Sequence, residues 1–254
     1  MFGIDVKAAL FEKAVARIKE YEKELRIATR YKPPLIGYVE ADNPLFNEFY
    51  FRNACAHPKK IFRPGNTVIT YFVPFEDEIT ESNRGGGAVS EAWSRAVGES
   101  IMLCAHINGA MREVMNELGY YETSGTNLPG DWDDKICGPV WSHKHAAFLA
   151  GLGDFGVAGA FYTAEGFAGC FGSVITTLRI EQSKEWTEDE LKDSDRICQD
   201  IETAILYAGV GKESLCPAGA IKSERVNRPA CAEFCKKQGQ PAPLPDVCGK
   251  CFFN

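Results

Sequence analysis

The chain has 254 residues, of which 45% are hydrophobic and 25% are charged, and its formal net charge is −7. This composition is ordinary for a globular protein built as one large domain or as a domain with a small module. The acidic balance argues against a broad basic surface for nucleic acid, and no apolar run approaches the ~20 residues of a membrane span. We therefore expect neither a membrane nor a nucleic acid among its partners.

The first predicted element is an amphipathic helix near the N-terminus. Its apolar residues recur at steps of three and four: Val6, Leu10, Ala14, Ile18, Tyr21 and Leu25. Acidic and basic residues alternate in this stretch, unlike the basic-then-apolar order of a secretory signal. We expect a cytoplasmic protein. In that reducing compartment the ten cysteines should include metal ligands and should not form a disulfide framework.

A buried strand and a long helix are predicted next. The stretch TVITYFVPF, residues 67–75, is rich in β-branched and aromatic residues, which favours a strand. Residues 90–118 predict a helix with one apolar stripe, made of Ile101, Cys104, Ile107, Met111, Val114, Met115 and Leu118. Cys104 in this stripe is interpreted as a small buried hydrophobic residue.

The segment WSHKHAAFLA, residues 141–150, predicts a short helix. Ser142 is its expected N-cap and Gly151 its expected C-terminal stop. The following stretch, residues 159–180, is interpreted as strand, turn and strand.

Composition changes near residue 190, where cysteine, glycine and proline replace the long apolar runs. Thr187 and Glu190 have the spacing of a capping box, which predicts a short helix there. We therefore place a boundary between a domain of residues 1–190 and a module of residues 191–254.

The stretch GLGDFGVAG, residues 151–159, contains the G-x-G-x-x-G spelling of a dinucleotide-binding loop. Such a loop follows a strand and opens a helix, so that the pyrophosphate meets the helix N-terminus. Here the glycines close a predicted helix and precede a strand. Two interpretations remain: a helix cap with a tight turn, or a loop whose missing side chains let a large, flat ligand approach the backbone.

Cys216 and Pro217 resemble the end of a bacterial ferredoxin run, C-x2-C-x2-C-x3-C-P. The three earlier positions of that run are not cysteines: Leu206, Gly209 and Lys212. The run therefore cannot hold a cluster of its own.

A C-x2-C pair at Cys248 and Cys251 follows near the C-terminus. With Cys216 and one of Cys231 or Cys235, this pair would complete the four thiolates of one [4Fe–4S] cluster. A structural zinc site and unrelated buried cysteines are the alternatives. Cys198 is treated as spare.

Residues 138–180, GPVWSHKHAAFLAGLGDFGVAGAFYTAEGFAGCFGSVITTLRI, resemble the core signature of epoxyqueuosine reductases and corrinoid reductive dehalogenases. Both have A-G-L-G-x-x-G after a helix and a G-x-x-x-T-x-L end. Residues 57–75 resemble the early P-G-x-x-x-V-I strand of these families, so the likeness spans most of residues 50–254. It implies an α/β (α+β) fold, in which a nitroreductase-like, cobalamin-binding domain precedes a ferredoxin-like iron–sulfur module.

The resemblance also implies site residues. A corrinoid would lie beside the glycine loop, lined by Gly151, Gly153, Gly156, Gly172, Ser173 and Thr176. The families usually carry two clusters, but here both the early cysteine run and the closing C-P are absent, which predicts one cluster. Cys231 stands in RPAC, about where the families place an intervening ligand, and is preferred to Cys235.

Several side chains are candidates for proton or redox chemistry. The proton-donating Asp of epoxyqueuosine reductases would fall at Ile136 or Cys137 here, and the Cys137 thiol is a candidate acid or redox group. Tyr162 is a candidate proton donor, with a packing aromatic as the ordinary alternative. His145 or His143 is a candidate acid or base, with an ordinary polar contact as the alternative. The two point away from each other because they are two helical positions apart.

The sequence thus predicts a cytoplasmic iron–sulfur oxidoreductase that passes electrons from one [4Fe–4S] cluster to a corrinoid or a bound small-molecule substrate. An external electron donor such as a ferredoxin or flavodoxin is implied. The alternatives are a non-catalytic iron–sulfur electron carrier or corrinoid-binding protein, and a zinc-stabilised binding module. Substrate, electron donor and oligomeric state are not determined by the sequence.

Overall fold

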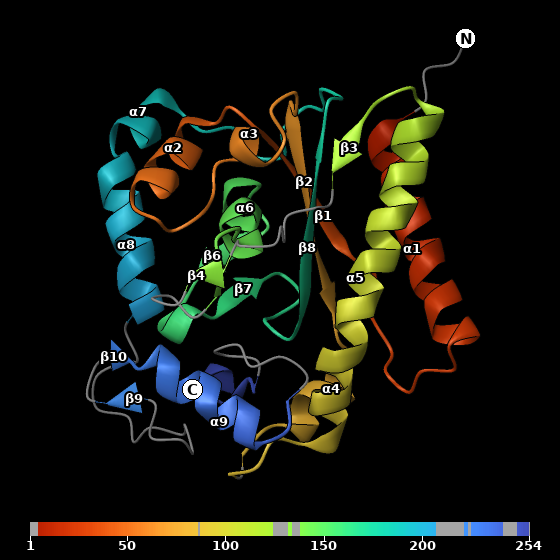
Figure 1. Ribbon diagram of the computed structural model, residues 1–254, viewed down its shortest axis with the longest axis vertical. Helices are drawn as coiled ribbons and strands as arrows, with labels where there is room; N and C mark the ends of the chain where they lie inside the picture. Colours follow the sequence, from red (N-terminus) through yellow and green to blue (C-terminus); the bar gives the residue numbers. More distant parts are fainter. Residues whose placement is uncertain are drawn as a thin grey trace.

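A four-stranded antiparallel sheet separates two helical layers in the computed structural model (Figure 1). The structure describes residues 5–85, 87–123, 132–133, 138–206, 221–222, 225–240 and 248–253. The strand order is β1-β2-β8-β3. The strands are β1 (Leu35–Glu40), β2 (Thr67–Pro74), β8 (Gly169–Thr176) and β3 (Glu122–Thr123). The predicted mixture of helices and strands is confirmed, and the main sheet is antiparallel.

One face of the sheet is covered by α1 (Val6–Glu24) and α5 (Glu91–Glu117). Both helices were predicted. Asp5 and Ser90 cap them, each accepting a hydrogen bond from a backbone N–H in the first turn. Ile101, however, is 51% exposed, so its place in the apolar stripe was wrong. It lies six residues from buried Ile107, which is about 120° around the helix at ~100° per residue.

The other face is covered by α6 (His143–Leu149), which packs on β2 and β8. Around it lie α2 (Pro44–Phe51), α3 (Pro58–Ile61), α7 (Glu188–Lys192) and α8 (Ser194–Leu206) (Figure 1). Every residue of β2 is buried, because helices cover the sheet on both sides. Cys198 and Ile201 of α8 share a core with Trp141 and Leu149, so α8 packs with the first domain. The predicted boundary at residue 190 stays a prediction.

The glycine loop begins as a helix cap. Gly151 has φ +73°, its N–H donates to Phe148 O, and the N–H of Leu152 donates to Ala147 O. These two bonds are the Schellman arrangement, which predicts glycine at this position because the conformation is left-handed. The expected end of the helix is confirmed.

A short hairpin follows this cap. It pairs β6 (Gly153–Phe155) with β7 (Phe161–Thr163), joined by the turn η1 (Val157–Gly159). The predicted strand, turn and strand over residues 159–180 are present as β7 and β8, but the two strands do not pair with each other. β8 pairs instead with β2 and β3 in the main sheet.

The remaining elements are short. They are α4 (Asp77–Ser82), β4 (Trp132–Asp133), β5 (Gly138–Pro139), β9 (Ile221–Lys222), β10 (Arg225–Val226), α9 (Arg228–Lys237) and η2 (Lys250–Phe253). Among the described residues, no helix combines the length and apolar character required to cross a bilayer.

Candidate redox site

Three cysteine side chains meet between α9 and the C-terminal segment. Cys231 and Cys235 lie one helical turn apart on α9, so they share a face. Together with Cys248 they form a small buried cluster, in which Cys235 is fully inaccessible. Hydrogen bonds to the thiols of Cys231 and Cys248, together with burial, raise the pKa of the Cys235 thiol. The tail cysteines predicted as ligands are thus brought together, and Cys235 contacts two of the others.

The segment of residues 248–253 is fastened to the loop after α4. Asn83 Nδ2 donates to Cys248 O at 2.8 Å, and Lys250 Nζ donates to the carbonyl oxygens of Asn83 and Gly85, both at 2.8 Å. Lys250 is only 4% exposed, and burial lowers its pKa. These buried bonds place Cys248 against the sheet domain.

Aromatic rings continue this contact to the β6–β7 hairpin. The ring of Phe253 lies 6.2 Å from Trp93 on α5 and 5.2 Å from Phe167, and Phe167 lies 5.7 Å from Tyr162 on β7. Burial, and then the charge of a Cys251 thiolate, raise the pKa of Tyr162. Tyr162 therefore lies where the cysteine segment meets the hairpin, although 39% of the residue is exposed.

The donor atoms that the described residues bring to this position include the thiols of Cys231, Cys235 and Cys248. Each of the eight described cysteines is free of disulfides. Within the described ranges, no group of three or more Cys, His, Asp or Glu residues has an arrangement that could hold a metal ion. Cys216, predicted as the fourth ligand, lies outside them. The chemistry of the donor set fits an iron–sulfur cluster or zinc, and the predicted ligand set stays a prediction.

Gly153 and Gly156 were predicted to leave room for a flat ligand. In the structure, Tyr162 takes up that room. A Cβ at Gly153 would stand 2.0 Å from Tyr162 O, and a Cβ at Gly156 would stand 2.4 Å from the Tyr162 ring. Gly151 serves the helix cap. The space beside Gly153 and Gly156 is therefore filled by the partner strand of the hairpin.

The three predicted pocket residues on β8 do not face one space. Gly172 lies against Tyr71 and Thr176 contacts Met115 of α5, whereas Ser173 contacts His143 of α6. Successive side chains of a strand point to opposite faces, so Ser173 lies on the other side of the sheet. The six residues do not form one wall, and they do not fit a corrinoid.

The two histidines of α6 diverge as expected. His143 Nδ1 lies 2.9 Å from Ser173 Oγ, and burial lowers its pKa to about 4. His145 lies between the rings of Phe49 and Phe155, at centroid distances of 4.7 and 4.9 Å, and its Nδ1 lies 2.7 Å from Ser142 Oγ.

Burial lowers the pKa of His145 to about 3, so its ring is neutral at pH 7. With an exposed fraction of 4% it packs in the core. Cys137, the other candidate acid, lies outside the described residues.

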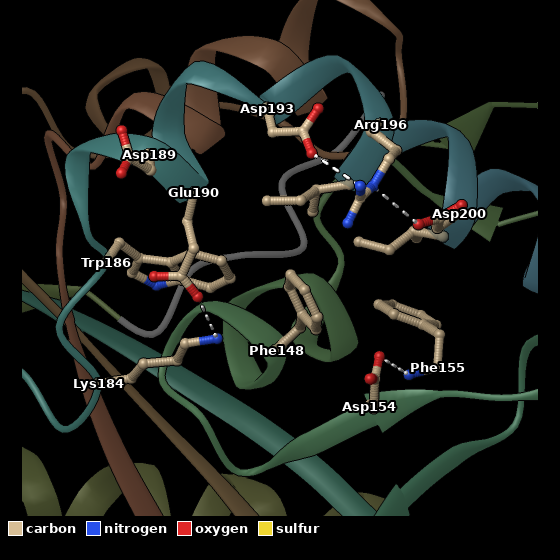
Figure 2. A pocket seen from close by; sticks show the side chains of 12 residues that line it. Phe148, Asp154, Phe155, Lys184, Trp186, Asp189, Glu190, Asp193, Arg196 and Asp200 are labelled. Atoms are coloured by element: carbon tan, nitrogen blue, oxygen red, sulfur yellow. Dashed lines mark hydrogen bonds and ion pairs between the residues drawn. The ribbon is translucent and has the colours of Figure 1, made fainter.

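A pocket of about 590 Å³ opens between α6, the hairpin and the α7–α8 segment (Figure 2). Its aromatic side is formed by Phe148, Phe155 and Trp186, and its rim carries five carboxylates and two cations. The charged lining residues are Asp154, Asp189, Glu190, Asp193, Asp200, Lys184 and Arg196. Lys184 Nζ lies 3.5 Å from the centroid of the Trp186 ring.

Sequence reasoning missed this pocket, because only a short helix with a capping box at Thr187 and Glu190 was predicted in the charged stretch of residues 182–195. The signal available was one aromatic residue, Trp186, inside that charged stretch. Its indole N–H donates to Leu149 O at 3.0 Å, which ties the connection to α6.

No protein-family model matches the chain, and no curated protein matches it. Among solved structures, epoxyqueuosine reductase from Streptococcus thermophilus is similar to it, with a TM-score of 0.47 and 17% identity. The alignment covers 94% of this chain and 66% of that protein. This chain therefore spans less than two thirds of the length of the protein it resembles.

Proposed function

We propose that this chain is an iron–sulfur oxidoreductase with one [4Fe–4S] cluster in its C-terminal module. The observation that supports it is the meeting of the Cys231, Cys235 and Cys248 thiols in one buried place. The proposed ligands are Cys216, Cys231, Cys248 and Cys251, with Cys235 as the alternative to Cys231. The resemblance of residues 138–180 to epoxyqueuosine reductases supports a reduction as the reaction class and leaves the substrate open.

Physical chemistry favours a cation among these thiols. Deprotonating a buried thiol beside two others leaves an uncompensated charge, and the raised pKa of Cys235 expresses that cost. Direct bonds between thiolates and a metal centre remove the cost, so metal binding also stabilises the fold of the module. When bound, the cluster supplies transfer of single electrons.

The hairpin is the proposed link between the cysteines and the substrate. Tyr162 contacts Phe167, which contacts Phe253, two positions after Cys251. Directly across the hairpin, Tyr162 pairs with Asp154, a lining residue of the pocket. We place a small-molecule substrate in that pocket and an external donor, such as a ferredoxin or flavodoxin, at the cysteine module.

Tyr162 is the proposed proton donor. Its phenol is protonated at neutral pH, although the raised pKa makes it a weaker acid than an exposed tyrosine, and it stands beside the pocket as the cross-strand neighbour of Asp154. No step is assigned to a corrinoid, because the residues expected to hold one face the protein's own side chains. A saturable spectral shift on titration with hydroxocobalamin would reinstate that cofactor.

Anaerobic purification tests the proposal. We expect a brown protein with broad absorbance near ~400 nm, about four irons per chain and matching sulfide. Cys248→Ala should lose the iron. Cys198→Ala should keep it, since Cys198 is an equally buried cysteine that lies in the second core. Stoichiometric zinc without iron, or full iron content in Cys248→Ala, would contradict the proposal.

A further inference from the structure

A second pair of cysteines lies far from the C-terminal cluster, between α5 and β8. Cys104 is on α5 and Cys170 is at the start of β8, so the two are distant in the chain. Both are free, and both are partly exposed. The proposed cluster uses neither of them.

The geometry of the α5–sheet contact brings these thiols together. Cys170 lies on the α5 face of β8, the face shared by Gly172 and Thr176, because strand side chains alternate. Cys104 Sγ lies 3.5 Å from the carbonyl oxygen of Phe171, the residue after Cys170. The Cys104 and Cys170 thiols are also hydrogen-bond partners.

Hydrogen bonds of the Tyr71 hydroxyl hold α5 against the sheet beside Cys104. Tyr71 Oη lies 3.0 Å from Cys104 O and 2.9 Å from Asn108 Oδ1, so the tyrosine of β2 anchors the turn of α5 that carries Cys104. Gly172 makes room for it, since a Cβ there would stand 2.1 Å from Tyr71 Oη. The relative position of the two thiols is therefore determined by buried packing.

We propose that Cys104 and Cys170 form a reversible disulfide that fastens α5 to β8. The oxidant is a low-molecular-weight disulfide such as oxidised glutathione. The Cys104 thiolate attacks one glutathione sulfur, which breaks the glutathione S–S bond and releases one thiol. Cys170 then gives up its proton and attacks Cys104 Sγ, which releases the second glutathione thiol. Two protein thiols are oxidised, one disulfide is reduced, and an excess of thiol reverses the reaction.

The environment assigns the roles within the pair. Hydrogen bonds from Cys170, and then from Tyr71, lower the pKa of Cys104, so it is the thiol that ionises first. The same contact with Cys104, together with burial, raises the pKa of Cys170. A lowered pKa in a partly exposed position is the usual property of the attacking thiol.

The test uses the full chain, purified anaerobically with its metal and incubated with oxidised glutathione without oxygen. Free thiols are then alkylated, and the digest is searched for a peptide joining Cys104 to Cys170. We expect that peptide, the loss of two alkylatable thiols, and full reversal by dithiothreitol. We also expect a higher melting temperature for the oxidised form, because closing a long loop restricts the unfolded chain.

Two single variants separate the roles. Cys170→Ser should accumulate a glutathione adduct on Cys104, because the second step is blocked, while Cys104→Ser should carry no adduct on Cys170. Cys55→Ser is the matched control and should keep the cross-link, since Cys55 lies in the second core, where its thiol forms hydrogen bonds with backbone groups of Ala56 and Ser142.

Glutathione adducts on other cysteines without a Cys104–Cys170 peptide would overturn the proposal. Equal adducts on Cys170 in Cys104→Ser would overturn the assigned order. Iron content is a separate readout, so failure of the iron–sulfur proposal would not affect either result.

Discussion

The carbonyl oxygen of Tyr162 occupies the position beside Gly153 where any other residue would place its Cβ. The separation would be 2.0 Å, and the obstacle is backbone, which cannot rotate away. The first loop glycine after the helix cap is thus required by the pairing of two short strands.

Replacing this glycine should destabilise the protein. Gly153→Ala must push β6 from β7, and we expect a loss of about 1–3 kcal/mol in the free energy of unfolding, the usual cost of overpacking. Denaturant unfolding measures it. Gly109→Ala is the matched control: Gly109 lies within α5 with open space at its Cβ, so alanine should add about 0.5–1 kcal/mol. Equal effects of the two changes would contradict this account.

Asn83 should decide whether the cysteine segment stays docked. Its side chain is fully buried, donates to Cys248 O and accepts from Ser90 N at 3.1 Å. Asn83→Ala removes the side-chain partner of the buried Cys248 carbonyl and of the partly buried Ser90 N–H, and we expect a loss of about 1–3 kcal/mol. Iron content should fall with it. Asn116→Ala, at an exposed position of α5, should change neither stability nor iron content.

The stability of the protein should rise with pH between about 4 and 6.5 because of His143, and between about 3 and 6.5 because of His145. Its pKa is about 3 in the folded protein and 6.5 in the reference state, so the unfolded chain binds the extra proton in this range. Stability is therefore lost as pH falls from 6.5 towards 3, by up to about 1.4 kcal/mol per unit for one proton.

His145→Phe should remove the His145 contribution to that slope and leave the contribution of His143, measured as the free energy of unfolding at several pH values. Phe49→Leu changes the packing against His145 without removing the titrating ring. It should lower stability and keep a pH-dependent slope, which becomes shallower only as far as the smaller side chain exposes the His145 ring to water. A slope unchanged in His145→Phe would show that other groups are responsible.

The capping box of α7, at the rim of the pocket, should contribute measurably to the free energy of unfolding. Thr187 Oγ1 accepts from Glu190 N, and the Glu190 carboxylate accepts from Thr187 N at 2.9 Å. Thr187→Ala should cost about 1 kcal/mol. Thr177→Ala cannot serve as the control for this change, because the Thr177 hydroxyl forms hydrogen bonds with the backbone of Tyr121. Thr80→Ala on α4, a helix in which no residue is fully buried, serves as the control, with an expected effect smaller than that of Thr187→Ala.

Local structure followed from the sequence wherever the cause lies within a few neighbouring residues. The α1 and α5 helices, the buried strand β2, the cap at Gly151 and the Thr187 capping box all depend on side-chain period, a backbone conformation or bonds within one turn. Each was predicted and each is present.

Contacts between residues distant in the chain could not be predicted from local sequence. The pairing of β7 with β6 was missed because a short strand carries no signal of its partner, and the opposite faces of Gly172 and Ser173 depend on which layer covers each side. The contact of Cys104 with Cys170 was likewise read as burial of one small residue.

The glycine-rich stretch, residues 151–159, shows most clearly which features depend on local sequence and which depend on tertiary packing. The sequence of this stretch predicts a helix end at Gly151, because the left-handed backbone conformation there depends on neighbouring residues alone. Whether Gly153 and Gly156 face a ligand or a neighbour was decided by where Tyr162 lies. The position of Tyr162 depends on packing between residues from the whole chain. The spacing of glycines within nine residues carries no information about that packing.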